Sequence, residues 1–131
     1  MKFLRIESSK FTPGIVLDPN HMVLEFYGFS LPENAIDFYH PILEWLRDLK
    51  KEVEKDIKKT KEINIIFKLV YYNSASLRQL VDIFHVFGEM YQQGIPLHLV
   101  WQYDCEDPQM ADAGKELADM THVPVNIVAY N

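Results

Sequence analysis

The pattern of hydrophobic and polar positions divides the chain into short strands and three helices. Apolar or alternating runs predict strands, and these cover residues 3–6, 15–17, 22–27, 62–72, 95–103 and 123–129. Apolar residues spaced three and four apart predict helices, and these run from about residue 30 to 49, 77 to 92 and 108 to 120. The order predicts a single α/β domain over residues 1–131, with a mixed sheet, an N-terminal hairpin and three later strand–helix crossovers.

The strand over residues 62–72 is predicted to be the central one. It is rich in β-branched and aromatic residues and carries almost no charge after Glu62. Such a composition is typical of a strand covered on both faces, in the middle of a largely parallel sheet. We therefore expect the other elements to be arranged around it.

A short polar turn, Asn73-Ser74-Ala75-Ser76, follows this strand. Ser76 and Gln79 have the spacing of a capping box, which predicts Ser76 as the N-cap of the next helix. Ser74 then lies near the free N–H groups of the helix start, where a phosphate is stabilised. The alternative is that Asn73, Ser74 and Ser76 serve only as turn and cap residues. The same spacing at Ser30 and Glu33 predicts the start of the first long helix.

The helix over residues 77–92 has an apolar arc wider than one-sided burial requires. One part of the arc is predicted to face the sheet. The remaining part consists of Ile83, Val86, Phe87 and Met90. Either a neighbouring helix covers these four residues, or they bind a partner beside Ser74.

Composition and charge exclude several classes of function. The chain has 131 residues, is 48% hydrophobic and carries a formal net charge of −6. This charge leaves no basic surplus for nonspecific nucleic-acid binding. No apolar run has the length of a membrane span, and the N-terminus lacks the apolar core of a signal peptide. Cys105 is the only cysteine, so no internal disulfide forms and the expected compartment is the cytoplasm.

No catalytic or cofactor motif stands out. The glycines form neither a dinucleotide fingerprint nor a phosphate-binding loop, and the scattered histidines lack metal-ligand spacing. We therefore expect no metal, no cofactor and no catalysis. An alternative is a small hydrolase that uses Ser74 with Asp82 and His85, although the turn lacks the Gly-x-Ser-x-Gly pattern.

Six segments, in order along nearly the whole chain, resemble one family. They are Thr12-Pro13 with Ile15, residues 28–34, residues 38–46, residues 72–77, Trp101-Gln102-Tyr103, and Asp107 through Met110 to Gly114 and Glu116. Together they are similar to the SiaC family of bacterial regulatory phosphoproteins. The resemblance implies a fold similar to that of anti-sigma-factor antagonists (STAS-like).

The resemblance also implies a partner switch. The unphosphorylated protein would bind and activate a diguanylate cyclase, raising cyclic-di-GMP and favouring biofilm or aggregation. A serine/threonine kinase of the SiaB type would add one phosphate, and a PP2C-type phosphatase would remove it. The modified residue of the family follows the Asn at the end of the central strand, which here makes it Ser74. Ser76 is the competing acceptor, and Ala75 stands where the family usually has a hydroxyl residue.

Two rival interpretations remain open at this point. The chain could be a constitutive binding or scaffold module of the same fold, without phosphorylation, or the small hydrolase described above. Phosphorylation by the cognate kinase would favour the switch over the scaffold. Loss of turnover on Ser74→Ala would favour the hydrolase.

Overall fold

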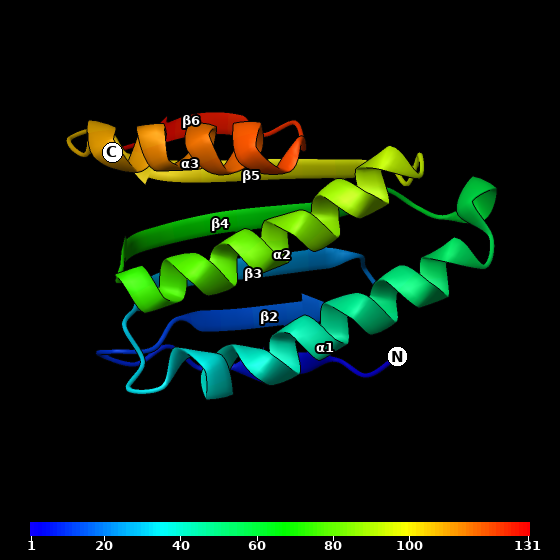
Figure 1. The fold of residues 1–131 in the computed structure, drawn as a ribbon, viewed down its shortest axis with the longest axis horizontal. Coiled ribbons are helices and arrows are strands. Elements are labelled where there is room, and N and C mark those ends of the chain that lie inside the picture. The colour runs from blue at the N-terminus through cyan, green and yellow to red at the C-terminus, as the bar shows by residue number, and fades with distance from the viewer.

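The computed structural model describes all 131 residues as one sheet with helices packed against it (Figure 1). The strands are β1 (Leu4–Ile6), β2 (Gly14–Asp18), β3 (Val23–Ser30), β4 (Ile63–Tyr72), β5 (Leu97–Asp104) and β6 (Asn126–Tyr130). The helices are α1 (Ala35–Glu54), α2 (Ser74–Gln92), α3 (Pro108–Thr121) and a short 3₁₀ turn, η1 (Ile57–Lys59). None of the helices combines the length and the apolar character that crossing a membrane requires.

The six strands lie in the sheet in the order in which they occur in the chain. β1, β2 and β3 pair antiparallel through short connections. β3, β4, β5 and β6 pair parallel, because a helix carries the chain back between each pair. This arrangement confirms the predicted single α/β domain with a mixed sheet and an N-terminal hairpin.

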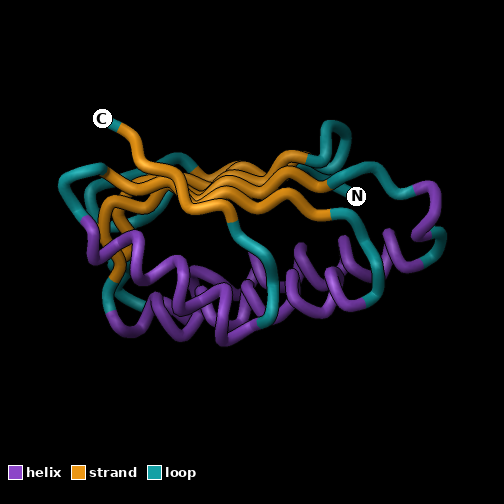
Figure 2. Tube along the Cα trace, turned by 90° about the horizontal axis from the view of Figure 1, so that it is seen from above, coloured by secondary structure: helices purple, strands orange, loops and turns teal.

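All the helices cover one face of the sheet, and the other face is open (Figure 2). β4 shows this directly: its side chains alternate, with Ile65 and Phe67 buried and Lys68 exposed. The prediction that this strand is covered on both faces is therefore wrong. Consecutive strands are added in one direction across the sheet, and crossovers of a constant, right-handed sense then place every helix on the same face.

The core lies between this sheet and the helices. Its centre is a group of aromatic rings, with Phe67 stacked on Phe26 at 4.4 Å between centroids and contacting Phe84 and Trp101 at 5.0 and 5.6 Å. Such ring pairs add to the stabilisation that burial of their area provides. They fix α2 directly over β4, so the start of α2 is held at the C-terminal edge of the central strands.

Helix α2 is the middle helix, with α1 on one side and α3 on the other (Figure 1). A Cβ built on Gly88 would overlap the Thr121 carbonyl oxygen, so only glycine lets the end of α3 approach this closely. On the other side, Lys50 Nζ of α1 lies 3.9 Å from Glu89 Oε2 of α2. Neighbouring helices and the sheet therefore cover most of the apolar arc of α2, and Leu77 in its first turn remains exposed.

This packing corrects the expected partner surface. Four residues were candidates for it, and all four lie in the core: Ile83, Val86, Phe87 and Met90. Their side chains are at most 3% exposed. They pack in the core against the sheet and the neighbouring helices. A covering helix therefore accounts for these four residues, and the prediction that they form an exposed docking surface is wrong.

The predicted helix caps are also corrected. Asn34, and not Ser30, caps α1 by accepting a hydrogen bond from the Asp37 N–H. Asn73, and not Ser76, caps α2, which therefore begins at Ser74. An Asn side chain immediately before the helix reaches the free N–H three residues on. Ser30 and Ser76 instead turn inward, as described below.

Candidate functional site at the start of helix α2

Ser74 is the first residue of α2 and its side chain is exposed. The backbone on both sides of it is fixed. The Asn73 N–H donates to the Ser30 carbonyl at 3.0 Å, and the Asn73 side chain accepts from the Ser76 N–H at 2.9 Å. The exposed hydroxyl is thus held on an ordered helix start and not on a free loop.

Two residues further on, Ser76 is sealed in the core. Its hydroxyl donates to the Ser30 carbonyl at 2.9 Å and accepts from the Ser30 hydroxyl at 2.8 Å. Because the Ser30 proton is used there, the Tyr39 hydroxyl donates to Ser30, at 2.6 Å. Ser30 and Ser76 are both 0% exposed. Ser76 therefore cannot receive a phosphoryl group without local unfolding, which removes the competing acceptor in the folded protein.

The three hydroxyls form a fully satisfied chain from α1 through the end of β3 to the first turn of α2. No buried side-chain nitrogen or oxygen in the protein lacks a partner. Burial raises the pKa of Tyr39 to about 12, so this hydroxyl keeps its proton across the physiological range. A satisfied buried network of this kind is rigid and specifies one arrangement.

A β-bulge near the end of β4 determines which of its last side chains point inward and which point outward. The pairing of β3 with β4 shifts after Gly28, so that Phe29 pairs with Tyr71 and Val70 is left without a partner. Gly28 has a positive φ of 92°, a conformation that glycine adopts without strain. The extra residue turns Tyr72 inward opposite Ser30, and Phe29 and Tyr71 outward.

Exposed apolar side chains are concentrated at the end of the sheet where α2 begins. Of the eleven large hydrophobic residues that are exposed, six belong to the segments that meet at this end of the sheet. We call them the apolar rim: Phe11, Phe29, Ile36, Val70, Tyr71 and Leu77. Exposed apolar surface of this kind often marks an interaction site on a monomeric protein, which makes this end of the sheet a candidate. Sequence patterns missed this set, because its members come from five separate segments.

A hollow of about 410 Å³ lies between the starts of α1 and α2. Its lining residues come from both helices and from the loop before α1: Glu33, Asn34, Ala35, Ile36, Ser74, Ala75, Arg78 and Gln79. Ser74 and Ala75 of the predicted turn thus lie at its surface. Glu33 and Arg78 are its charged groups.

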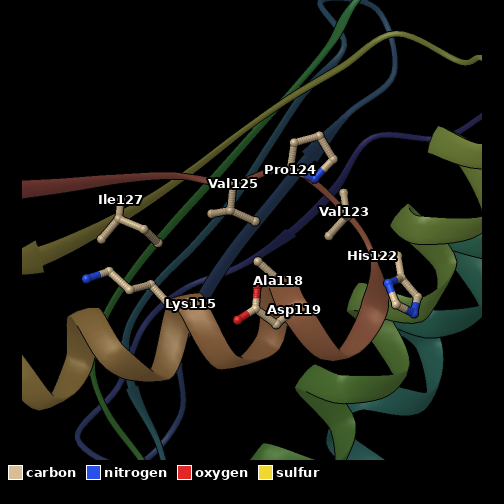
Figure 3. A pocket seen from close by; sticks show the side chains of 8 residues that line it. All are labelled: Lys115, Ala118, Asp119, His122, Val123, Pro124, Val125 and Ile127. Carbon is tan, nitrogen blue, oxygen red and sulfur yellow. The ribbon is translucent and has the colours of Figure 1, made fainter.

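A larger hollow, about 560 Å³, lies at the opposite end of the sheet (Figure 3). Lys115 and Asp119 project into it from α3, across from Val125 and Ile127. It holds one cationic and one anionic side chain beside His122. Nowhere in the protein do three or more His, Cys, Asp or Glu side chains come together in the manner of a metal site.

The three residues of the hydrolase alternative are not brought together. Ser74 and His85 lie eleven positions apart on one straight helix, a separation of about 16 Å along its axis. A nucleophile and its base must come within hydrogen-bonding distance. This arrangement does not support acyl transfer at Ser74.

Comparison with known proteins places this geometry in a family. A family model described as SiaC family regulatory phosphoprotein matches residues 6–130. An uncharacterized protein of Pseudomonas aeruginosa (strain UCBPP-PA14) is 27% identical over 135 residues, which cover 100% of this chain and 99% of that protein.

Two solved structures share the fold. The crystal structure of apo-SiaC from Pseudomonas aeruginosa is similar with a TM-score of 0.86 and 26% identity, over 98% of this chain and 100% of that chain. The crystal structure of the diguanylate cyclase SiaD in complex with its activator SiaC, from the same organism, contains a chain similar with a TM-score of 0.85 and 25% identity. That match covers 97% of this chain and 99% of the other.

Proposed function

The chain belongs to the SiaC family of regulatory phosphoproteins, and we propose that it is a non-catalytic partner switch controlled at Ser74. In this proposal the unphosphorylated protein binds and activates a diguanylate cyclase in the cytoplasm. Phosphorylation of Ser74 by a kinase of the SiaB type releases the cyclase, and a PP2C-type phosphatase restores binding.

The cyclase partner is supported by the relative that forms such a complex. That relative, SiaC of Pseudomonas aeruginosa, is named as the activator of the diguanylate cyclase SiaD. It matches this chain over nearly its full length, so no large segment of the relative is without a counterpart. We infer the same class of partner for this chain.

The observation that carries Ser74 as the switch is the contrast between the two serines of the turn. Ser74 is exposed, whereas Ser76 is 0% exposed and fully hydrogen-bonded. A kinase needs a hydroxyl that can enter its own active site. Ser74 meets this requirement on a rigid helix start, beside the apolar rim.

The apolar rim gives the switch a physical basis. A partner that docks there removes water from side chains such as Phe29, Tyr71 and Leu77, which favours binding. A phosphate on Ser74 adds nearly two negative charges within the same surface, and burying them without a matched cation is costly. Each 1.4 kcal/mol of that cost weakens binding about tenfold.

The proposal is tested by titrating a diguanylate cyclase that resembles SiaD with four forms of the protein. The cyclase is taken from the organism that makes this protein. Unmodified protein and Ser74→Ala should bind equally, and Ser74→Asp and phospho-Ser74 should bind at least about tenfold more weakly. Gln92→Glu is the matched control, since it adds one negative charge at the exposed far end of the same helix. Equal affinity of all forms would refute the switch.

A second experiment separates this proposal from a constitutive scaffold of the same fold. The protein is incubated with the cognate kinase and the modified peptide is mapped by mass spectrometry. We expect one phosphate, on Ser74, and none on the Ser74→Ala variant. Absence of any phosphate would leave a scaffold that binds the cyclase without regulation.

A further inference from the structure

We propose that Arg78 is the intramolecular partner of the phosphate on Ser74, so that the modified side chain is held against the hollow between α1 and α2. The inference rests on the proposed phosphorylation of Ser74. It assigns a role to a residue that neither the turn motif nor the apolar pattern of the sequence singled out.

Helix geometry brings the two side chains together. Ser74 and Arg78 are four residues apart on α2, so they lie on the same face with about 5–6 Å between their Cβ atoms. Side chains on a helix lean toward its N-terminus. The long Arg78 side chain is therefore directed back over Ser74, and both residues line the same hollow.

Arg78 is free to take this role. It is exposed and makes none of the ion pairs in the protein, in contrast to Arg5, which pairs with Glu7 at 3.0 Å. The other charged residue of the hollow, Glu33, is exposed and also makes no ion pair. No existing salt bridge must break before Arg78 turns to a phosphate.

The chemistry of the pair is specific. A guanidinium presents parallel N–H donors that match two phosphate oxygens, which makes this cation well suited to a phosphate. A pair with Arg78 holds the phosphate close to the first turn of α2, beside Leu77 and Ile36 of the apolar rim. The charge then stays on the docking surface, whereas an unpaired phosphate would extend into water. Arg78 offsets only one of the nearly two negative charges of the phosphate, and Glu33 adds another, so the hollow stays net negative and docking over it stays costly.

The inference is tested on protein carrying phosphoserine at position 74, installed during translation, so that no kinase is needed. The ionisation of the phosphate is followed by ³¹P NMR at low salt between pH 4 and 9. A nearby cation favours the dianion, so the second phosphate pKa should be about half a unit higher in Arg78→Gln than in the unsubstituted phosphoprotein.

Arg47→Gln is the matched control. Arg47 is also an exposed arginine without an ion pair, but it lies twelve residues into α1, about 18 Å from the helix start. Its substitution should leave the phosphate pKa unchanged. An unchanged pKa in Arg78→Gln, or equal shifts in both variants, would overturn the inference.

The outcome does not depend on whether the proposed switch is correct. If no kinase modifies Ser74 in the cell, the mapping experiment fails while the NMR titration still reports on Arg78. If Arg78 has no role, the titration fails while Ser74 is still found phosphorylated. Melting curves of both arginine variants confirm that the fold is intact before either result is read.

Discussion

Helices α1 and α2 start side by side at the same end of the sheet, yet their first turns are built in opposite ways (Figure 1). Each follows an asparagine whose side chain accepts from the third N–H of the helix. In α1 the first residue, Ala35, is buried and the third, Asp37, is exposed. In α2 the first residue, Ser74, is exposed and the third, Ser76, is buried.

The two helix starts differ in whether the chain itself supplies a negative charge to the helix dipole. The first turn of α1 carries its own acidic residue, Asp37, which complements the positive end of the helix dipole. The first turn of α2 has no acidic residue. In the proposed switch, a phosphate on Ser74 would supply this negative charge from outside the chain.

The largest expected effect comes from placing an acidic residue at the third position of α2, where α1 has one. Ser76→Asp buries a carboxylate among hydroxyls that already have partners, and it should cost about 3–5 kcal/mol of unfolding free energy. Ser74→Asp should stay within about 0.5 kcal/mol of the unsubstituted protein. Urea unfolding measures both, and equal stabilities would contradict the inverted burial of the two turns.

The next effect concerns the hydroxyl chain that joins the two helix starts. The pKa of Tyr39 is about 12 in the folded protein, against 10.0 for an ordinary tyrosine. The stabilisation that comes from keeping the Tyr39 hydroxyl neutral is therefore complete below pH 10, and it is lost as the pH rises through 12. The loss should amount to about 2 kcal/mol. Unfolding measured from pH 9 to 12 should show this extra loss in the unsubstituted protein and not in Tyr39→Phe.

The two asparagine caps provide a third comparison. Asn34→Ala and Asn73→Ala should each lower the unfolding free energy by about 1 kcal/mol. Only Asn73→Ala should also slow phosphorylation of Ser74, because it loosens the turn that carries the acceptor. Urea unfolding and kinase assays on the same samples test this. Equal phosphorylation rates in both variants would show that the cap has no part in presenting Ser74.

The smallest effect is on the stability of the phosphorylated protein itself. A phosphate at the first position of α2 should raise the unfolding free energy by about 0.3–1 kcal/mol at low salt, because it complements the helix dipole. High salt should remove the gain. Differential scanning calorimetry at two salt concentrations measures it, and a destabilised phosphoprotein would show that the phosphate does not act on the helix start.

Much of the fold could be predicted from the local pattern of the chain. The apolar run at residues 15–17 and the alternation in residues 22–27 predicted the hairpin of β2 and β3, and the uncharged run after Glu62 predicted β4. Helix starts were less predictable. Ser76 with Gln79 has the spacing of a capping box, but Asn73 is the cap, because burial of Ser76 against Ser30, 46 positions away, decides between them.

The site was predictable in part. The order of strand, turn and helix predicted Ser74 near a helix start, in the turn two residues before the cap, whereas the structure has it as the exposed first residue of α2. Arg78 was missed, because the predicted helix left Ser74 outside it, and only the observed start at Ser74 puts the two residues four apart on one helix face. The apolar rim was missed as well, because its members are spread along the chain from position 11 to position 77.

The sequence by itself determined the elements, their order and the presence of Ser74 near a helix start, since these depend on periodicity and turn chemistry over a few neighbouring residues. Tertiary structure alone decided which surfaces are free. Adding each strand on the same side of the last placed all helices on one face and left the other open. That packing buried Ile83 and Met90 in the core, while Phe29 and Tyr71 stay exposed near the ends of their strands. Exposure depends on what lies next to a residue in space, and no local pattern contains that information.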